Sequence, residues 1–65
     1  MKIGDSVVTK KETHSLAGEF VSAGTRGTVV DIRGDGLTKV SFHAEFPTKR
    51  IVVAIVYSDS LQKVK

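Results

Sequence analysis

Two histidines and one glutamate are the side chains whose types and spacing come closest to a metal site. His43 and Glu45 are separated by one residue, so they share a face if they lie in a strand. His14, from an earlier part of the chain, would complete a ligand set of two histidines and one carboxylate. The same spacing is ordinary for the solvent-facing side of a strand, and we expect no bound metal and no cofactor.

Three aspartates are candidates for acid–base chemistry, and each of them fits a structural role. Asp35 lies between two glycines, which is typical of a turn. Asp5 follows a glycine and fits a turn or a bond to nearby backbone. Asp31 stands between two aliphatic residues, where it marks a solvent-facing strand position or a bulge. No serine or histidine has the surroundings of an activated nucleophile, so we expect that the chain is not an enzyme.

The segment 24–27, Gly-Thr-Arg-Gly, does not match a phosphate-binding loop. It lacks the loop's lysine and a following helix that would present backbone N–H groups to a phosphate. We interpret it as a turn, and we expect Gly27 to be needed for close packing of the backbone.

Nucleic-acid binding is an alternative, because ten Lys and Arg outnumber seven Asp and Glu, for a net charge of +3. Aromatic side chains on a basic strand surface can stack bases. The relevant residues are Arg33, Lys39, His43, Phe46, Lys49, Arg50 and Tyr57. We expect Phe20 and Phe42 in the core, which leaves Phe46 and Tyr57 as the only aromatic rings besides His43. Such a site would bind RNA or DNA weakly and in a salt-sensitive way.

The elements that position these residues belong to one small domain, residues 1–65. The chain has no cysteine, so disulfides do not stabilise it. We see no signal peptide at the N-terminus, and the longest apolar run, 51–56, is far too short to span a bilayer. We therefore expect a cytoplasmic protein with no membrane partner.

Valine, isoleucine and threonine dominate the apolar positions, which predicts an all-β fold. We expect five strands, over residues 2–10, 25–33, 37–44, 49–57 and 61–65. The long loop 11–24 contains Leu16, Phe20 and Val21, which we expect to fold back onto the core. The segment 34–36 (Gly-Asp-Gly) predicts a tight hairpin turn, Pro47 marks a second turn over 45–48, and 58–60 fits one 3₁₀ turn in which Ser58 or Asp59 bonds nearby backbone.

Two glycine motifs carry a resemblance that covers nearly the whole chain. They are Gly-Asp-x-Val at 4–7 and Gly-Thr-x-Gly-x-Val at 24–29, followed by the runs at 26–32, 40–42, 53–56 and 58–61. In these motifs the chain resembles a family of small bacterial proteins with a five-stranded SH3-like barrel. The resemblance implies the fold that is shared by the small domain of the nitrile hydratase β-subunit, the photosystem I accessory subunit of similar fold, and KOW-type ribosomal domains, and it specifies no activity.

The type II dihydrofolate reductase of resistance plasmids has the same barrel and acts as a tetramer, which makes it a remote alternative. Its late strand carries a Val-Gln-Ile-Tyr run in the active site. The matching window here is 53–56, in which Ala54 replaces the glutamine and Val56 replaces the tyrosine. Tyr57 is one residue too late, and a shift by one residue faces the other side of a strand.

The strand expected at 49–57 is apolar on both faces, although one face of a strand in a small antiparallel barrel should meet water. Ile51, Val53, Ile55 and Tyr57 point one way, and Val52, Ala54 and Val56 point the other way. The pattern does not decide which face is the core. Either the loop 11–24 covers the second apolar face, or that face is a protein interface.

We therefore expect a non-catalytic interaction module that self-associates as a homo-oligomer or docks as an accessory subunit on a larger protein. Its partner-binding residues are Phe46, Lys49, Arg50, Val53, Ile55 and Tyr57.

Overall fold

The computed structural model describes residues 1–15, 17–45 and 48–64, and it is all-β in these ranges. Its seven strands are β1 (Ser6–Thr9), β2 (Thr13–His14), β3 (Phe20–Val21), β4 (Arg26–Ile32), β5 (Leu37–Ala44), β6 (Arg50–Tyr57) and β7 (Leu61–Lys63). A single turn of 3₁₀-helix, η1 (Ser58–Ser60), joins β6 to β7. The described part of the chain holds no helix long and apolar enough to cross a membrane.

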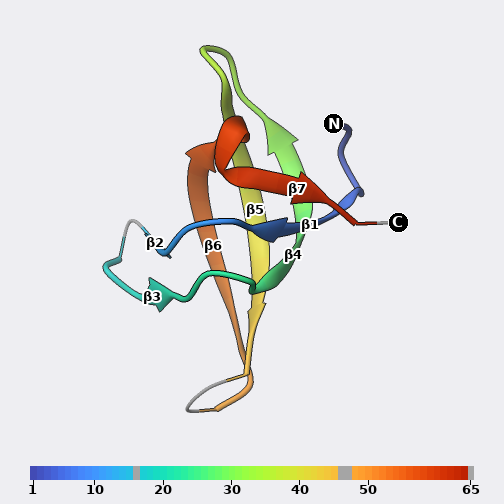
Figure 1. Ribbon diagram of the computed structural model, residues 1–65. Helices are drawn as coiled ribbons and strands as arrows, with labels where there is room; N and C mark the ends of the chain where they lie inside the picture. Colours follow the sequence, from blue (N-terminus) through green and yellow to red (C-terminus); the bar gives the residue numbers. More distant parts are fainter. Residues whose placement is uncertain (16, 46–47, 65) are drawn as a thin grey trace.

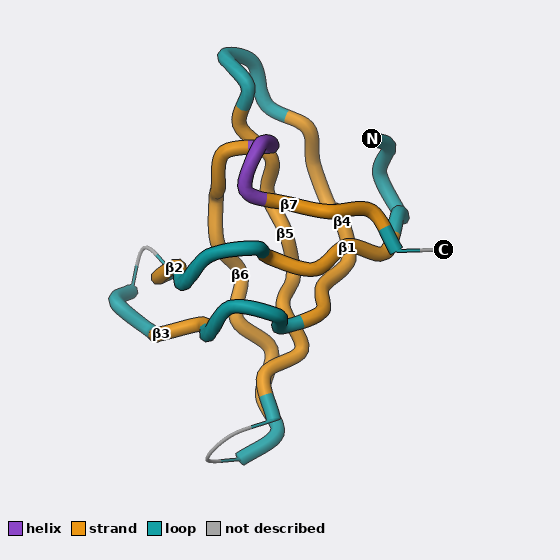
Figure 2. The backbone as a smooth tube through the Cα atoms, in the orientation of Figure 1, coloured by secondary structure: helices purple, strands orange, loops and turns teal. Residues whose placement is uncertain are grey.

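Five of the strands form one antiparallel sheet in the order β6-β5-β4-β1-β7. The remaining two, β2 and β3, form a separate short hairpin that projects to one side of the sheet (Figure 1). The strands β4, β5 and β6 follow one another in both sequence and space, whereas β7 returns to lie beside β1 (Figure 2). The strands β6 and β7 are therefore the two end strands of the sheet.

The first and last strands are shorter than the sequence predicts. We expected a strand over residues 2–10, but β1 begins at Ser6 because residues 2–5 form a turn. The N–H of Asp5 donates to the carbonyl of Lys2 at 3.1 Å, and Gly4 has a φ of 94°. Such a positive φ leaves the extended region of the backbone. The strand expected over 61–65 ends at Lys63, and Lys65 lies outside the described residues.

The long loop 11–24 contains the β2–β3 hairpin, which the sequence analysis did not predict. Val21 turns inward as expected and is 1 % exposed. Our prediction that Phe20 belongs to the core is wrong, because its side chain is 45 % exposed and its ring packs edge-on against His14, with ring centroids 5.5 Å apart. Leu16, the third apolar residue of this loop, lies outside the described residues.

The core is built from alternate residues of the strands, as the period of two in a half-buried sheet requires. Phe42 is its one buried aromatic residue in the described ranges, and small aliphatic side chains surround it. The buried apolar residues are Val7, Val21, Val29, Val40, Phe42, Ala44, Val52, Ala54, Val56 and Leu61. The core-facing side of β6 is thus Val52, Ala54 and Val56, which answers the question that the sequence pattern left open.

The predicted turns are confirmed where the structure describes them. Asp35 and Gly36 have φ values of 62° and 75°, as the tight β4–β5 hairpin demands. The pairing of β4 with β5 shifts between Val29 and Asp31, so the bulge lies at Val30, and Asp31 follows it as a partly exposed strand residue opposite Lys39. The predicted 3₁₀ turn is η1, but Ser58 bonds the buried Thr38, hydroxyl to hydroxyl at 2.6 Å, instead of nearby backbone. The turn over 45–48 includes Phe46 and Pro47, which lie outside the described residues.

Gly27 lies within strand β4 and not in the turn before it, because the turn ends with Gly24, whose φ is 87°. The requirement for glycine at position 27 is nevertheless confirmed. A Cβ atom there would lie 2.6 Å from Cγ1 of Val40, 2.9 Å from the carbonyl oxygen of Ser41 and 3.0 Å from Cδ1 of Phe42. These distances are shorter than van der Waals contact, so β4 and β5 approach each other across Gly27 as no other residue would permit.

We predict that Gly27→Ala lowers the free energy of unfolding by about 1–3 kcal/mol, because the added methyl overpacks the core. For a domain of this size, each kcal/mol corresponds to a fall of about 4–8 °C in melting temperature. Gly34→Ala is the matched control, since a Cβ atom at Gly34 would meet nothing within 4 Å. Thermal unfolding followed by circular dichroism measures both, and equal melting temperatures would contradict the packing role of Gly27.

Candidate interaction surface

The side of β6 that faces away from the core is an exposed apolar stripe. Its members alternate with the core residues of the same strand and are Ile51, Val53, Ile55 and Tyr57, called here the outer β6 stripe. The relative exposures of Ile51, Val53 and Tyr57 are 56 %, 44 % and 68 %, and Ile55 is half-buried. An aliphatic surface of this kind on the outer side of a small sheet is typical of a protein interface.

The neighbouring strand β5 presents a polar surface beside the outer β6 stripe. Across the β5–β6 ladder, Ile55 lies opposite Lys39, Val53 opposite Ser41, and Ile51 opposite His43. The outer face of the sheet therefore changes from apolar on β6 to polar and basic on β5. The exception is Leu37, which lies opposite Tyr57 and is half-buried.

The six residues predicted to bind a partner do not all lie on this face. Val53, Ile55 and Tyr57 belong to the outer β6 stripe, and Lys49 is exposed just before the strand begins. Arg50 has the opposite orientation, because it alternates with Ile51 and shares the side of Val52. Phe46 lies outside the described residues.

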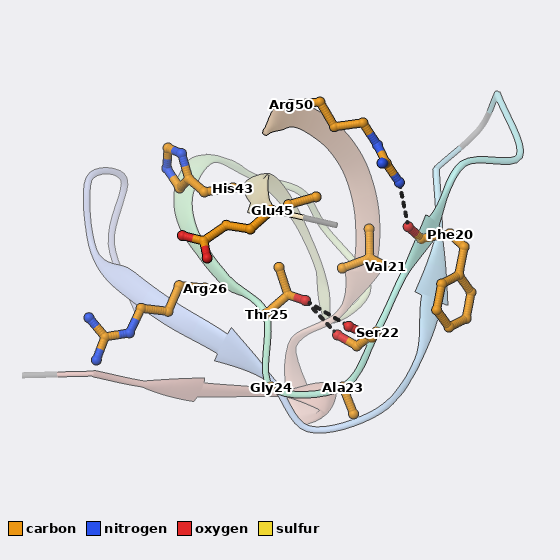
Figure 3. A pocket seen from close by; sticks show the side chains of 11 residues that line it. Phe20, Val21, Ser22, Ala23, Gly24, Thr25, Arg26, His43, Glu45 and Arg50 are labelled. Carbon is orange, nitrogen blue, oxygen red and sulfur yellow. Dashed lines mark hydrogen bonds between the residues drawn. The ribbon is translucent and has the colours of Figure 1, made fainter. Parts of the chain in front are cut away.

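Arg50 ties the β2–β3 hairpin to the start of β6. Its Nε lies 3.3 Å from Oε2 of Glu19, and its NH2 group donates to the carbonyl oxygen of Phe20 at 3.4 Å. Figure 3 shows this side chain reaching over to the hairpin. The hairpin is thus attached on the core side of β6, and it leaves the outer β6 stripe exposed.

An open cleft of about 1020 Å³ lies beneath the hairpin, between β3, the start of β4 and the end of β5. The buried Val21 lines it, and the hydroxyl of Thr25 donates to the carbonyl oxygen of Ser22 at 2.8 Å (Figure 3). The side chains of Arg26 and His43 extend away from Val21 in this view. Four titratable side chains line the cleft, Arg26, His43, Glu45 and Arg50.

The ligands of the metal site considered above do not come together. Within residues 1–15, 17–45 and 48–64, no three histidine, cysteine, aspartate or glutamate side chains are grouped so that they could hold a metal ion. His14 instead packs against Phe20 on the hairpin, while His43 and Glu45 lie at the end of β5. Of the residues considered for nucleic acid, Arg33 belongs to the turn between β4 and β5, Lys39 and His43 lie on β5, and Arg50 is bonded to the hairpin.

Sequence reasoning missed four further exposed apolar residues in the described ranges, Met1, Ile3, Val30 and Ile32. Val30 and Ile32, with exposures of 41 % and 47 %, lie within a strand. Both lie on β4 at or beyond the bulge, where the simple alternation of faces is interrupted. A run of aliphatic residues that contains one aspartate is the signal that could have located them. They belong to a different strand from the outer β6 stripe, with β5 between the two.

The chain matches no family model, no curated protein and no solved structure with which it was compared.

Asp5 is the carboxylate whose pKa the structure perturbs, and its role is structural. The backbone N–H of Lys2 donates to Oδ2 of Asp5 at 2.8 Å, and the ammonium group of Lys63 lies 3.8 Å from the same oxygen. The hydrogen bond from Lys2, helped by the charge of Lys63, lowers the pKa of Asp5 below its usual value. The carboxylate links the N-terminal turn to β7 and is already engaged, so it is no candidate for acid–base catalysis.

We predict that Asp5 contributes to stability at neutral pH and loses this contribution in acid. Because the pKa is lower in the folded state, the contribution is complete above the pKa of the unfolded chain, about 3.9, and disappears as the pH falls through the folded pKa. Asp5→Asn should therefore be less stable than the parent near neutral pH, and the difference should shrink in acid. Urea unfolding between about pH 7 and pH 2 measures this, and a difference independent of pH would contradict it.

Proposed function

We propose that this protein is a non-catalytic module that self-associates by burying the outer β6 stripe against a second copy. The observation that carries the proposal is the exposure of three large apolar residues, Ile51, Val53 and Tyr57, on the outer side of one strand. Burying one valine or isoleucine side chain completely contributes roughly 1.5–3 kcal/mol. A partner that covered the stripe would gain several such contributions at once.

The alternative cover for the stripe was the loop 11–24, and the position of that loop favours a partner instead. Its hairpin β2–β3 is attached through Glu19 and Phe20 to Arg50, which lies on the core side of β6. The exposed fractions given above for Ile51, Val53 and Tyr57 are values with the hairpin present, so the hairpin does not cover these side chains.

A second copy is the simplest partner, because a two-fold contact uses the same patch on both molecules. A chain of 65 residues buries only about 60 % of the surface that its unfolded form exposes, so its fold is marginal in isolation. Association of folded copies stabilises such a fold by mass action.

We also propose a more specific fold than the all-β sheet described above, namely an SH3-like barrel. The order of the elements supports it: a long loop follows β1, a tight turn joins β4 to β5, and a 3₁₀ turn precedes the last strand. The hairpin and the segment before it would close the barrel, since a cleft of about 240 Å³ separates Lys11 and Thr13 from Ile55 and Tyr57.

We predict that lysine at two adjacent positions of β6 has opposite effects. Ala54→Lys places a charge in the core, where position 54 is 1 % exposed, and should unfold the protein. Val53→Lys places the same charge on the outer β6 stripe and should give a folded monomer, with a dissociation constant at least about tenfold higher than that of the parent. The two variants have the same net charge, so each is the control for the other.

Light scattering over a range of protein concentrations, with circular dichroism for folding, measures both effects. A parent that stays monomeric at the highest concentration would contradict self-association. If such a monomer bound mixed-sequence RNA or DNA with a steep loss of affinity in salt, the nucleic-acid alternative would replace the proposal.

A further inference from the structure

The outer β6 stripe has a different neighbour on each side. On one side lies β5, whose ladder with β6 places Lys39 opposite Ile55. On the other side, residues 11–13 lie against the edge of β6, and together with Ile55 and Tyr57 they line a cleft of about 240 Å³. The strand β2 continues from this segment and also lies close to β6. At the level of Ile55, β6 is therefore flanked by β5 on one side and by the start of the hairpin on the other.

Glu12 lies on the side of the hairpin that faces away from the core. Thr13 is paired with the buried Val21, and residues directly opposite each other in a ladder share one face, so Thr13 faces inward. His14, the next residue, faces outward and packs against the exposed ring of Phe20. Because faces alternate along an extended chain, Glu12 shares the outward side with His14, and it is exposed. The outward side of the hairpin therefore adjoins the outer β6 stripe.

Each flank of the stripe carries a charge at the level of Ile55, and the two charges have opposite signs. Lys39 supplies an ammonium group on the β5 side, where its other ladder neighbour is Asp31 on β4. Glu12 supplies the one carboxylate among the described residues that line the cleft on the hairpin side. Lys11 also lines this cleft, but it lies in a bend, before the alternating segment begins. A surface with such flanks can be electrostatically complementary to a second copy of itself.

We propose that two copies pack face to face about a two-fold axis that runs along β6, so that each outer β6 stripe covers the other and Lys39 of each copy lies over Glu12 of the other. The inference rests on the proposed self-association and specifies its geometry. Rotation about this axis keeps the two β6 strands nearly parallel and exchanges the two flanks, so β5 of one copy lies over the start of the hairpin of the other. The two-fold symmetry then forms the Lys39–Glu12 pair twice in each dimer.

The charges disfavour the other way in which two sheets can stack with their strands aligned. A two-fold axis across the strands would place β5 over β5. Lys39 and His43 lie opposite Ile55 and Ile51, on either side of Val53, so this axis brings Lys39 of each copy over His43 of the other. Lys39 would then be covered without a carboxylate from the second copy, and burying an unpaired charge is costly. The axis along β6 covers the same stripe and supplies that carboxylate.

Exchange of the two charges tests the arrangement. Lys39→Glu and Glu12→Lys should each raise the dissociation constant of the dimer about tenfold, because each change replaces two attractions by two repulsions. The double variant has the charges exchanged and the net charge of the parent, so its dissociation constant should return to within about threefold of the parent's. Lys2→Glu is the control for Lys39→Glu, since Lys2 is exposed in the N-terminal turn and its replacement changes the net charge equally. Sedimentation equilibrium measures the dissociation constants, and circular dichroism monitors folding.

The outcomes separate the arrangement from self-association itself. A dimer whose double variant binds no more tightly than the single variants overturns the arrangement and leaves self-association intact, whereas a parent that is monomeric at all concentrations overturns both. Carbodiimide, which joins an amine to a carboxylate in contact with it, checks the pair directly. When heavy-isotope-labelled and unlabelled copies are mixed, digestion of the cross-linked dimer should give a mixed-isotope peptide that joins Lys39 to Glu12. Mixed-isotope peptides that join Lys39 only to other carboxylates would contradict the pairing.

Discussion

The packing of Phe42 across Gly27 is the contact on which the rest of the fold depends. Phe42 is fully buried and lies opposite Gly27 in the β4–β5 ladder. The core otherwise consists of small aliphatic side chains, so this one ring supplies the largest buried volume in the described ranges. The glycine lets the two strands approach closely enough for the ring to be enclosed. Since a slip of one residue would turn Phe42 outward, the contact also determines the register of β4 on β5.

The register of β5 in turn determines what β6 presents to solvent. Each residue of β5 that faces the core bonds β6, and each residue that faces outward bonds β4, as the bonds of Gly36 and Leu37 indicate. For each residue, the strand toward which its backbone N–H and C=O point is therefore coupled to the face of the sheet on which its side chain lies. On β6 this coupling gives the same residues, such as Val53, exposed side chains and backbone groups that point away from β5.

Much of the fold could be predicted from the sequence, because the residues that form its turns act locally. Asp35 and Gly36 have a positive φ, and the Gly-Asp-Gly run at 34–36 located the β4–β5 hairpin. The alternating pattern of β6 predicted two sets of side chains on opposite faces of the strand. A period of two is the same for both faces, so it could not indicate which set faces the core. That choice depends on Phe42 and Gly27, which are distant in sequence. The prediction that Phe20 belongs to the core was wrong because its ring packs against His14 on the hairpin and not against the core.

The pairing of β1 with β7 joins distant parts of the chain, since Val7 lies opposite Lys63. The strands β4, β5 and β6, by contrast, are consecutive, so their pairs are local. Non-local pairs form more slowly, because a long stretch of chain must first be closed into a loop. The three consecutive strands can therefore pair before β1 meets β7, and the later step of folding is the one that brings the two ends of the chain together.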